Sequence, residues 1–122
     1  MVDVADDLLP DGNNVYGTVV APDGMQPVLE SVQRLVGKDN AYIYVSGYNG
    51  ASTLHFSTQR CDFESTPLDD GSQHLLNGGV AGSVEAVIEF VKELSLHLSD
   101  AQIKHSFEVY DESEDLAFEI SN

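Results

Sequence analysis

The chain has 122 residues, and its 21 Asp and Glu against five Lys and Arg give a formal net charge of −16. This length fits one domain, and a 42% hydrophobic fraction with five Phe and five Tyr excludes a disordered acidic tail. The few scattered basic residues exclude binding to a nucleic-acid backbone, and no apolar run approaches the roughly 20 residues that span a bilayer.

Residues 1–12 mix acidic residues with Pro10 and Gly12 and show no periodic pattern. We expect a loose acidic leader, followed by a single domain over residues 13–122. The N-terminus has neither a cationic start nor an apolar stretch, so a cytoplasmic location is predicted. The single cysteine, Cys61, excludes an internal disulfide and is expected to be a small buried hydrophobic residue.

Alternation over residues 13–21 predicts a first strand, with Val15, Gly17 and Val19 on one side. Helical spacing of apolar residues then predicts a helix from Met25 to Val36, and Gly37 supplies its stop.

The pair Asn49-Gly50 lies between two alternating runs, 41–45 and 53–56, which indicates a β-hairpin with a two-residue turn. Counting back from this turn predicts four pairs, Val45 with Leu54, Ile43 with Phe56, Tyr44 with His55, and Tyr42 with Ser57. The predicted core side consists of Ile43, Val45, Leu54 and Phe56. The predicted outer side consists of Tyr42, Tyr44, Ser46, Thr53 and His55.

Residues 59–83 are polar and rich in glycine, so we expect a long surface connection with at most one short strand near Cys61 to Phe63. Ser83 is a predicted N-cap for a second helix with an apolar face from Val84 to Leu98. The alternating runs around the acidic residues 111–115 predict a C-terminal hairpin. The whole predicts an α+β fold, an antiparallel sheet of about five to six strands with two helices on one face.

The sequence contains no strong motif for phosphate binding, metal binding or catalysis. The Gly78–Ser83 loop precedes a helix, as anion sites do, but it lacks the Lys of a phosphate loop, and a flexible lead into the helix is the better interpretation. The four histidines lack metal-ligand spacing, and a weak divalent site at His74 beside Asp69 and Asp70 is disfavoured. We expect no metal and no cofactor. No nucleophile motif is present, so catalysis is not expected.

The acidic residues are arranged more distinctively. Glu85, Glu89 and Glu93 recur every four residues along the second helix. The C-terminal turn adds Asp111, Glu112, Glu114 and Asp115. A solvated helix face and a polar turn would explain both groups. The alternative is a partner-binding face, in which Tyr42, Tyr44, Tyr48 and His55 supply anchors and the acidic residues supply attraction.

The preferred hypothesis is an acidic inhibitor of the immunity-protein type that neutralises a basic toxin or nuclease by steric and electrostatic occlusion. One alternative is a nucleic-acid mimic that blocks a DNA- or RNA-binding protein. Another is a housekeeping domain that is adapted to high salt or binds a small ligand. Each hypothesis gives the acidic residues a use outside folding.

Overall fold

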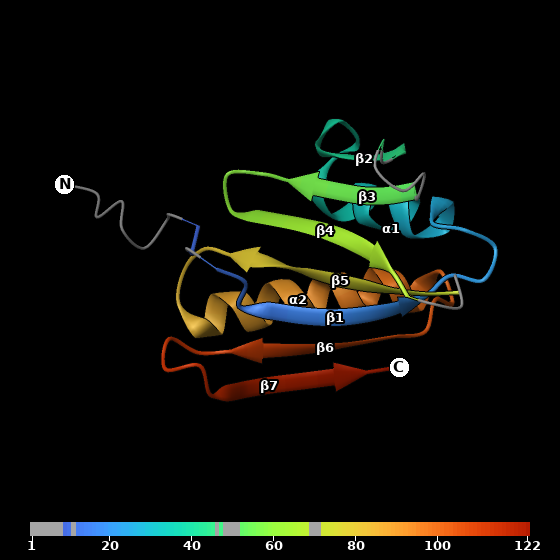
Figure 1. Ribbon diagram of the computed structural model, residues 1–122. Coiled ribbons are helices and arrows are strands. Elements are labelled where there is room, and N and C mark those ends of the chain that lie inside the picture. Colours follow the sequence, from blue (N-terminus) through green and yellow to red (C-terminus); the bar gives the residue numbers. More distant parts are fainter. Residues whose placement is uncertain (1–8, 11, 46, 48–51, 69–71) are drawn as a thin grey trace.

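A computed structural model describes residues 9–10, 12–45, 47, 52–68 and 72–122 of the chain. Its seven strands form one antiparallel sheet in the order β2-β3-β4-β5-β1-β6-β7, and both α-helices lie on the same side of it (Figure 1). We call the side that the helices cover the helix face and the opposite side the open face. The strands are β1 (Val15–Val20), β2 (Ala41–Val45), β3 (Ser52–Ser57), β4 (Cys61–Pro67), β5 (Gln73–Val80), β6 (His105–Tyr110) and β7 (Leu116–Ser121). The helices are α1 (Gln26–Val36), the short 3-10 helix η2 (Lys38–Asn40) and α2 (Val84–Asp100).

The predicted α+β class is confirmed, with more strands than expected. Helix α1 ends where Gly37 adopts a φ of 101°, a backbone conformation that glycine reaches without a Cβ clash. Helix α2 begins at its predicted cap, where the Ser83 hydroxyl accepts a hydrogen bond of 3.3 Å from the Ala86 N–H. Both helix boundaries therefore follow from local backbone chemistry. Among the described residues, no helix is both long and apolar enough to cross a membrane.

The prediction of a long connection over residues 59–83 is wrong, because this segment forms β4 and β5 in the centre of the sheet. The short strand that the sequence allows near Cys61 to Phe63 is the beginning of β4. The inward positions of these strands include small and polar residues, which conceal the alternation. Ser65 is one of them, and its hydroxyl accepts a hydrogen bond of 2.8 Å from the Leu54 N–H. Gly78 is another, and the ring of Phe63 occupies the space where a Cβ would lie. The segment expected as a glycine-rich loop contributes Gly78, Gly79 and Val80 to β5.

The hairpin of β2 and β3 forms with a register two residues from the prediction. Val45 lies opposite Ser52 and Ile43 lies opposite Leu54. A shift of two keeps every side chain on its predicted side, because side chains alternate with a period of two. Leu54 and Phe56 are fully buried, but Val45 is 67% exposed at the end of an edge strand, contrary to its predicted core position. The predicted turn, Asn49-Gly50, lies outside the described residues.

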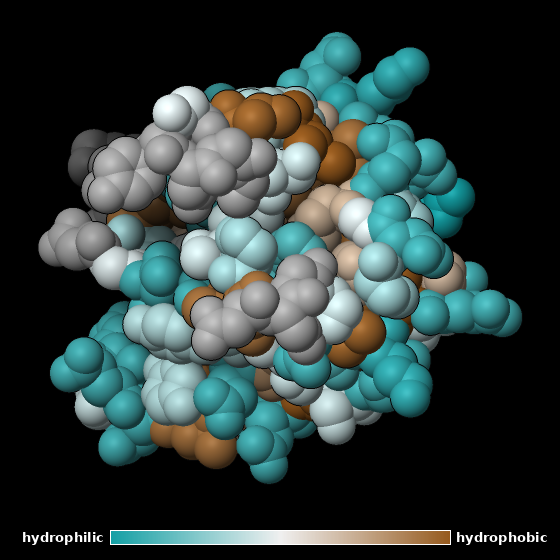
Figure 2. All heavy atoms as spheres, turned by 45° about the vertical axis from the view of Figure 1, so that its right-hand side comes forward, coloured by the Kyte–Doolittle hydropathy of each residue, from teal (hydrophilic) through white to brown (hydrophobic). Residues whose placement is uncertain are grey.

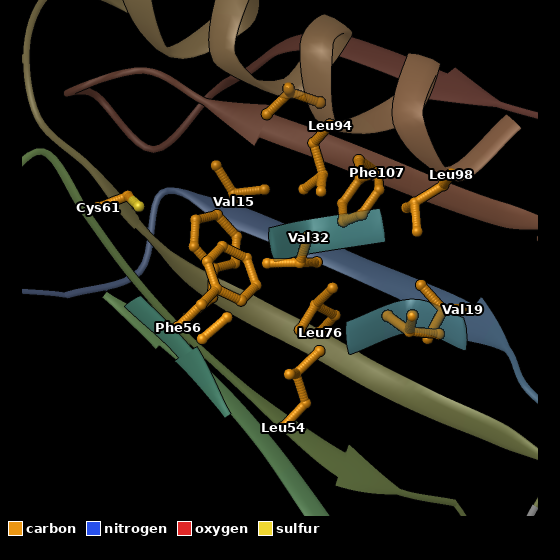
Figure 3. Close-up of a cluster of buried hydrophobic side chains, with 14 of the residues drawn as sticks. Val15, Val19, Val32, Leu54, Phe56, Cys61, Leu76, Leu94, Leu98 and Phe107 are labelled. Carbon is orange, nitrogen blue, oxygen red and sulfur yellow. The ribbon is translucent and has the colours of Figure 1, made fainter. Parts of the chain in front are cut away.

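The core lies between the helix face and the two helices (Figure 3). Phe56 and Phe63 stack with ring centroids 4.8 Å apart, and Phe90 of α2 continues the stack at 5.9 Å from Phe63. In β1 and β6, the Phe107 ring lies directly over Gly17. The helices and the core thus occupy one side of the sheet, and neither α-helix covers the other side.

Candidate functional site

The open face carries the tyrosines and carboxylates that alternate with the core residues along the strands. The four tyrosines of the described residues all belong to it: Tyr16, Tyr42, Tyr44 and Tyr110. Four carboxylates share it: Asp62, Glu64, Glu108 and Glu119. None of the seven described strands contains a Lys or an Arg. The negative charge of this face is therefore not balanced by cations on its own strands.

Tyr42, His55 and Asp62 form a continuous hydrogen-bonded chain across β2, β3 and β4. The Tyr42 hydroxyl lies 2.9 Å from His55 Nδ1, and His55 Nε2 lies 2.7 Å from an Asp62 carboxylate oxygen. With neutral His55, Nε2–H donates to Asp62 and Nδ1 accepts from the tyrosine hydroxyl, so the geometry specifies one tautomer. The Tyr42 ring remains 50% exposed, which leaves it available to a partner.

Tyr44 is held in a similar way. Its hydroxyl donates a hydrogen bond of 2.8 Å to Glu64 on β4. This bond, together with desolvation and the charge of the carboxylate, raises the pKa of Tyr44 above 10.0. The rings of Tyr42 and Tyr44 lie 6.1 Å apart. We call Tyr42, Tyr44, His55, Asp62 and Glu64 the β2–β4 cluster.

A second group lies in the other half of the sheet. The Tyr16 and Tyr110 rings meet edge to face at 5.6 Å, and the Tyr110 hydroxyl donates to Glu108 at 3.1 Å. That bond is the main reason why the pKa of Tyr110 is raised. These residues line a concavity of about 440 Å³ together with Asp111 and Glu114 of the β6–β7 turn. We call Tyr16, Glu108, Tyr110, Asp111 and Glu114 the β1–β6 cluster.

A shallow groove of about 780 Å³ runs along the open face over β5, β1, β6 and β7. Glu108 and Glu119 line it and lie directly opposite each other in the β6–β7 ladder. Like charges in this position cost stability. Some of the other lining residues are small and polar, and the hydroxyls of Thr18 and Ser106 form a hydrogen bond of 2.9 Å. The groove is therefore an open surface of mixed polar and apolar lining with one pair of carboxylates, and not an enclosed cavity.

The acidic stripe of α2 lies on the other side of the molecule. Glu85, Glu89 and Glu93 are exposed, but they belong to the helix layer, and the sheet separates them from Tyr42 and Tyr44. Figure 2 shows hydrophilic side chains along the right-hand margin and at the lower left of the molecule, with hydrophobic areas between them. The residues that the sequence predicts as one partner face thus fall on two separate surfaces.

The acidic turn is separated from the predicted tyrosines as well. Residues 111–115 join β6 to β7, at the opposite edge of the sheet from β2. The carboxylate of Asp111 accepts hydrogen bonds from the Ser113 and Asp115 N–H groups at 2.9 and 3.0 Å, so it shapes the turn itself. Glu112 and Asp115 are exposed there. Tyr48 lies outside the described residues.

The remaining candidates from the sequence, His74 and Cys61, are buried parts of the sheet. His74 is 6% exposed and lies within β5 opposite Val19, not in a loop. Asp69 and Asp70, its expected neighbours, lie outside the described residues. Cys61 is fully buried, as expected, and burial raises the pKa of its thiol. Within the described residues, no group of three or more His, Cys, Asp and Glu side chains could hold a metal ion.

Sequence reasoning did not assign Tyr16, Asp62, Glu64, Glu108 or Tyr110 to the site. The available signal was the alternation of Asp62 and Glu64 with Cys61, Phe63 and Ser65, which marks a half-buried strand once Ser65 is allowed an inward position. Comparison of the chain with protein-family models, with curated proteins and with solved structures finds no match. The geometry of the open face is therefore the basis for assigning a function.

Proposed function

We propose that the protein binds a basic protein through its open face and inhibits it by covering its functional surface. The observation that carries this proposal is the composition of that face, which combines four tyrosines and four carboxylates on strands without a Lys or an Arg. Unbalanced charge of one sign attracts an oppositely charged partner and raises its association rate.

The tyrosines supply the second requirement of a protein interface. Tyr42 is 50% exposed, Tyr16 is 41% exposed and Tyr44 is 38% exposed. Tyrosine is enriched among the residues that dominate binding energy, because it buries a large ring and keeps a polar hydroxyl. Three of the four hydroxyls are bonded to His55, Glu64 or Glu108, so these side chains lose little additional freedom on binding.

An immunity-type role is the specific form of this proposal. A nuclease, or another toxin that acts on an anionic substrate, presents a cationic site, and an acidic face of matching size would block that site. In this mechanism, the carboxylates of the open face attract the basic partner, and the tyrosines of the β2–β4 cluster and the β1–β6 cluster anchor the complex. The nucleic-acid mimic is less well supported, because a mimic of phosphates has no evident use for four tyrosines on its binding face.

The test uses two variants that remove the same charge from opposite sides of the sheet. Asp62→Asn, Glu64→Gln and Glu108→Gln together change the open face, whereas Glu85→Gln, Glu89→Gln and Glu93→Gln together change α2. Each protein is immobilised and exposed to lysate of its source cells at increasing salt, and retained proteins are quantified by mass spectrometry. We expect a stoichiometric basic protein that the wild type and the α2 variant retain and the open-face variant loses. Equal retention by all three proteins would refute the proposed surface.

A further inference from the structure

The outer edge of β2 has backbone groups that point away from the sheet. The Leu54 N–H donates to Ser65 on β4, so Leu54 directs its backbone away from β2. Ile43 lies directly opposite Leu54, and in an antiparallel ladder its own N–H and C=O must then point away from β3. The same holds for Ala41 and Val45 by alternation, and the Ala41 carbonyl accepts a bond of 3.3 Å from Gln33 Nε2. Ile43 and Val45 thus present backbone groups beyond the last strand of the sheet.

Among the described residues, Gln33 of α1 covers this edge at Ala41, but the part at Ile43 and Val45 carries no charge, proline or bulge. Exposed edges are commonly protected by a charged residue, a proline or a bulge. The sequence of β2 is Ala-Tyr-Ile-Tyr-Val, and its pairing with β3 is regular along its length. The opposite edge strand, β7, carries Glu119, and its pairing with β6 shifts between Val109 and Tyr110. The two edges therefore differ, and β2 is the one suited to pairing.

We infer that β2 accepts an extended basic segment of the protein partner as an additional antiparallel or parallel strand. The inference rests on the proposed function and specifies how the partner attaches. Strand addition supplies affinity through backbone hydrogen bonds, while alternate side chains supply specificity. Charge complementarity argues for a basic segment. Asp62 and Glu64 belong to β4, two strands in from the edge, but they lie on the same face as Tyr42 and Tyr44 and bond to His55 and Tyr44, and none of the described strands carries a Lys or an Arg.

The positions of the two tyrosines define the pattern of the segment. Tyr42 and Tyr44 point to the open face, and their hydroxyls are held by His55 and Glu64. An Arg or Lys at every second position of an added strand would lie beside these rings, where cation–π attraction acts within about 6 Å. The intervening side chains would lie beside Ile43 and Val45 and should be apolar. The partner segment is therefore expected to alternate basic and apolar residues.

A labelled peptide of alternating arginine and valine tests the inference by fluorescence anisotropy with the full chain at low salt. Two further peptides carry N-methyl groups, one on every arginine nitrogen and the other on every valine nitrogen. Both keep the charge of the parent, but each blocks a different row of backbone N–H groups. Val45→Pro removes an outward N–H of the protein, and Val45→Ala is its control. Circular dichroism checks that each variant is folded.

Strand addition predicts that one methylated peptide loses about tenfold or more in affinity, from one or two blocked hydrogen bonds, while the other binds like the parent. Val45→Pro should weaken the parent peptide and Val45→Ala should not. Equal binding of all three peptides would overturn the inference and leave the acidic face as a charge-driven surface. If Val45→Pro does not fold, the peptide comparison on the wild type decides alone. Absence of binding by every peptide would overturn the inference and also count against the proposed function.

Discussion

Two glycines in adjacent strands make room for two phenylalanine rings. A Cβ on Gly17 would overlap the ring of Phe107, and a Cβ on Gly78 would overlap Phe63 and the Asp62 carbonyl oxygen. Both rings are fully or almost fully buried, so they have little space to move.

We therefore predict that Gly17→Ala lowers the free energy of unfolding by about 1–3 kcal/mol, as overpacking of a core does. Urea unfolding monitored by circular dichroism measures the change. Gly12→Ala is the matched control, because a Cβ at Gly12 meets no atom within 4 Å. Phe107→Leu should recover part of the loss in the Gly17→Ala background. Equal stability of the two alanine variants would show that the ring does not pack against Gly17.

The Tyr44 hydroxyl gives a prediction about pH. Its bond to Glu64, the largest cause, raises the pKa of Tyr44 in the folded protein above its ordinary value of 10.0. The folded state then keeps this proton at a pH where the unfolded state has lost it. The stabilisation is complete below the unfolded pKa and is lost as the pH rises through the folded pKa.

Glu64→Gln removes the charge and weakens the acceptor, so the pKa of Tyr44 should fall toward 10.0. The ring-carbon NMR signals of the tyrosines, followed between about pH 8 and pH 12, measure this. Tyr110 is the internal control, because its own raised pKa depends on Glu108. A Tyr44 titration that is identical in both proteins would contradict the observed bond.

At the scale of elements, the N-terminus of α2 depends on one side chain. The Ser83 hydroxyl is the acceptor for the Ala86 N–H, and Gly82 precedes it with a φ of 105°. Ser83→Ala should reduce the free energy of unfolding by about 1 kcal/mol, the usual loss for a helix cap. Ser83→Asp should retain most of the stability, since Asp also caps. Chemical unfolding of both variants compares them, and an alanine variant as stable as the aspartate variant would argue against the cap.

The sequence predicts some elements better than others, for physical reasons. Helices α1 and α2 have long apolar faces and clear boundary residues, Gly37 and Ser83, so periodicity alone locates them. Periodicity does not locate strands β4 and β5, because their inward positions include Ser65 and Gly78. The Ser65 hydroxyl is buried with a hydrogen bond from the Leu54 N–H, and the Phe63 ring fills the space beside Gly78. The inward placement of Ser65 and Gly78 can be explained only when the neighbouring strands are known.

The candidate site was predictable in part for the same reason. Alternation in β2 and β3 correctly places Tyr42, Tyr44 and His55 on one side of the sheet. Their acidic partners, Asp62 and Glu64, belong to β4, of which the sequence predicts at most a short strand near Cys61 to Phe63 without a pairing partner, so the hydrogen bonds to them were not predictable. Strand order, which joins segments distant in sequence, is the information that the local pattern lacks.

At the scale of the molecule, charge opposes folding. The net charge is −16, and among the described residues one Lys or Arg pairs with a carboxylate, Lys92 with Glu89 at 3.8 Å. Salt screens repulsion between exposed charges. The urea midpoint should therefore rise between about 0.05 M and about 0.5 M NaCl. Sucrose at matched osmolality controls for solute exclusion. A midpoint that falls with salt would mean that attractive pairs dominate.

The acidic residues are also distributed over two surfaces, because the sheet separates those of the open face from those of α2. The two triple variants described above remove three carboxylates each, so their overall charge is the same. A difference between them reports the location of binding and not the total charge. Association kinetics are the most sensitive measure, since charge near the contact surface controls the rate of encounter.

The decisive measurement is the association rate constant of each triple variant with the basic protein that the wild type retains. We predict that the Asp62, Glu64 and Glu108 variant associates about tenfold more slowly and with a weaker salt dependence, because charges close to the contact surface control the rate of encounter. The Glu85, Glu89 and Glu93 variant should associate at nearly the wild-type rate. A larger loss of association rate in the α2 variant would contradict binding at the open face and place the binding surface on the helix layer.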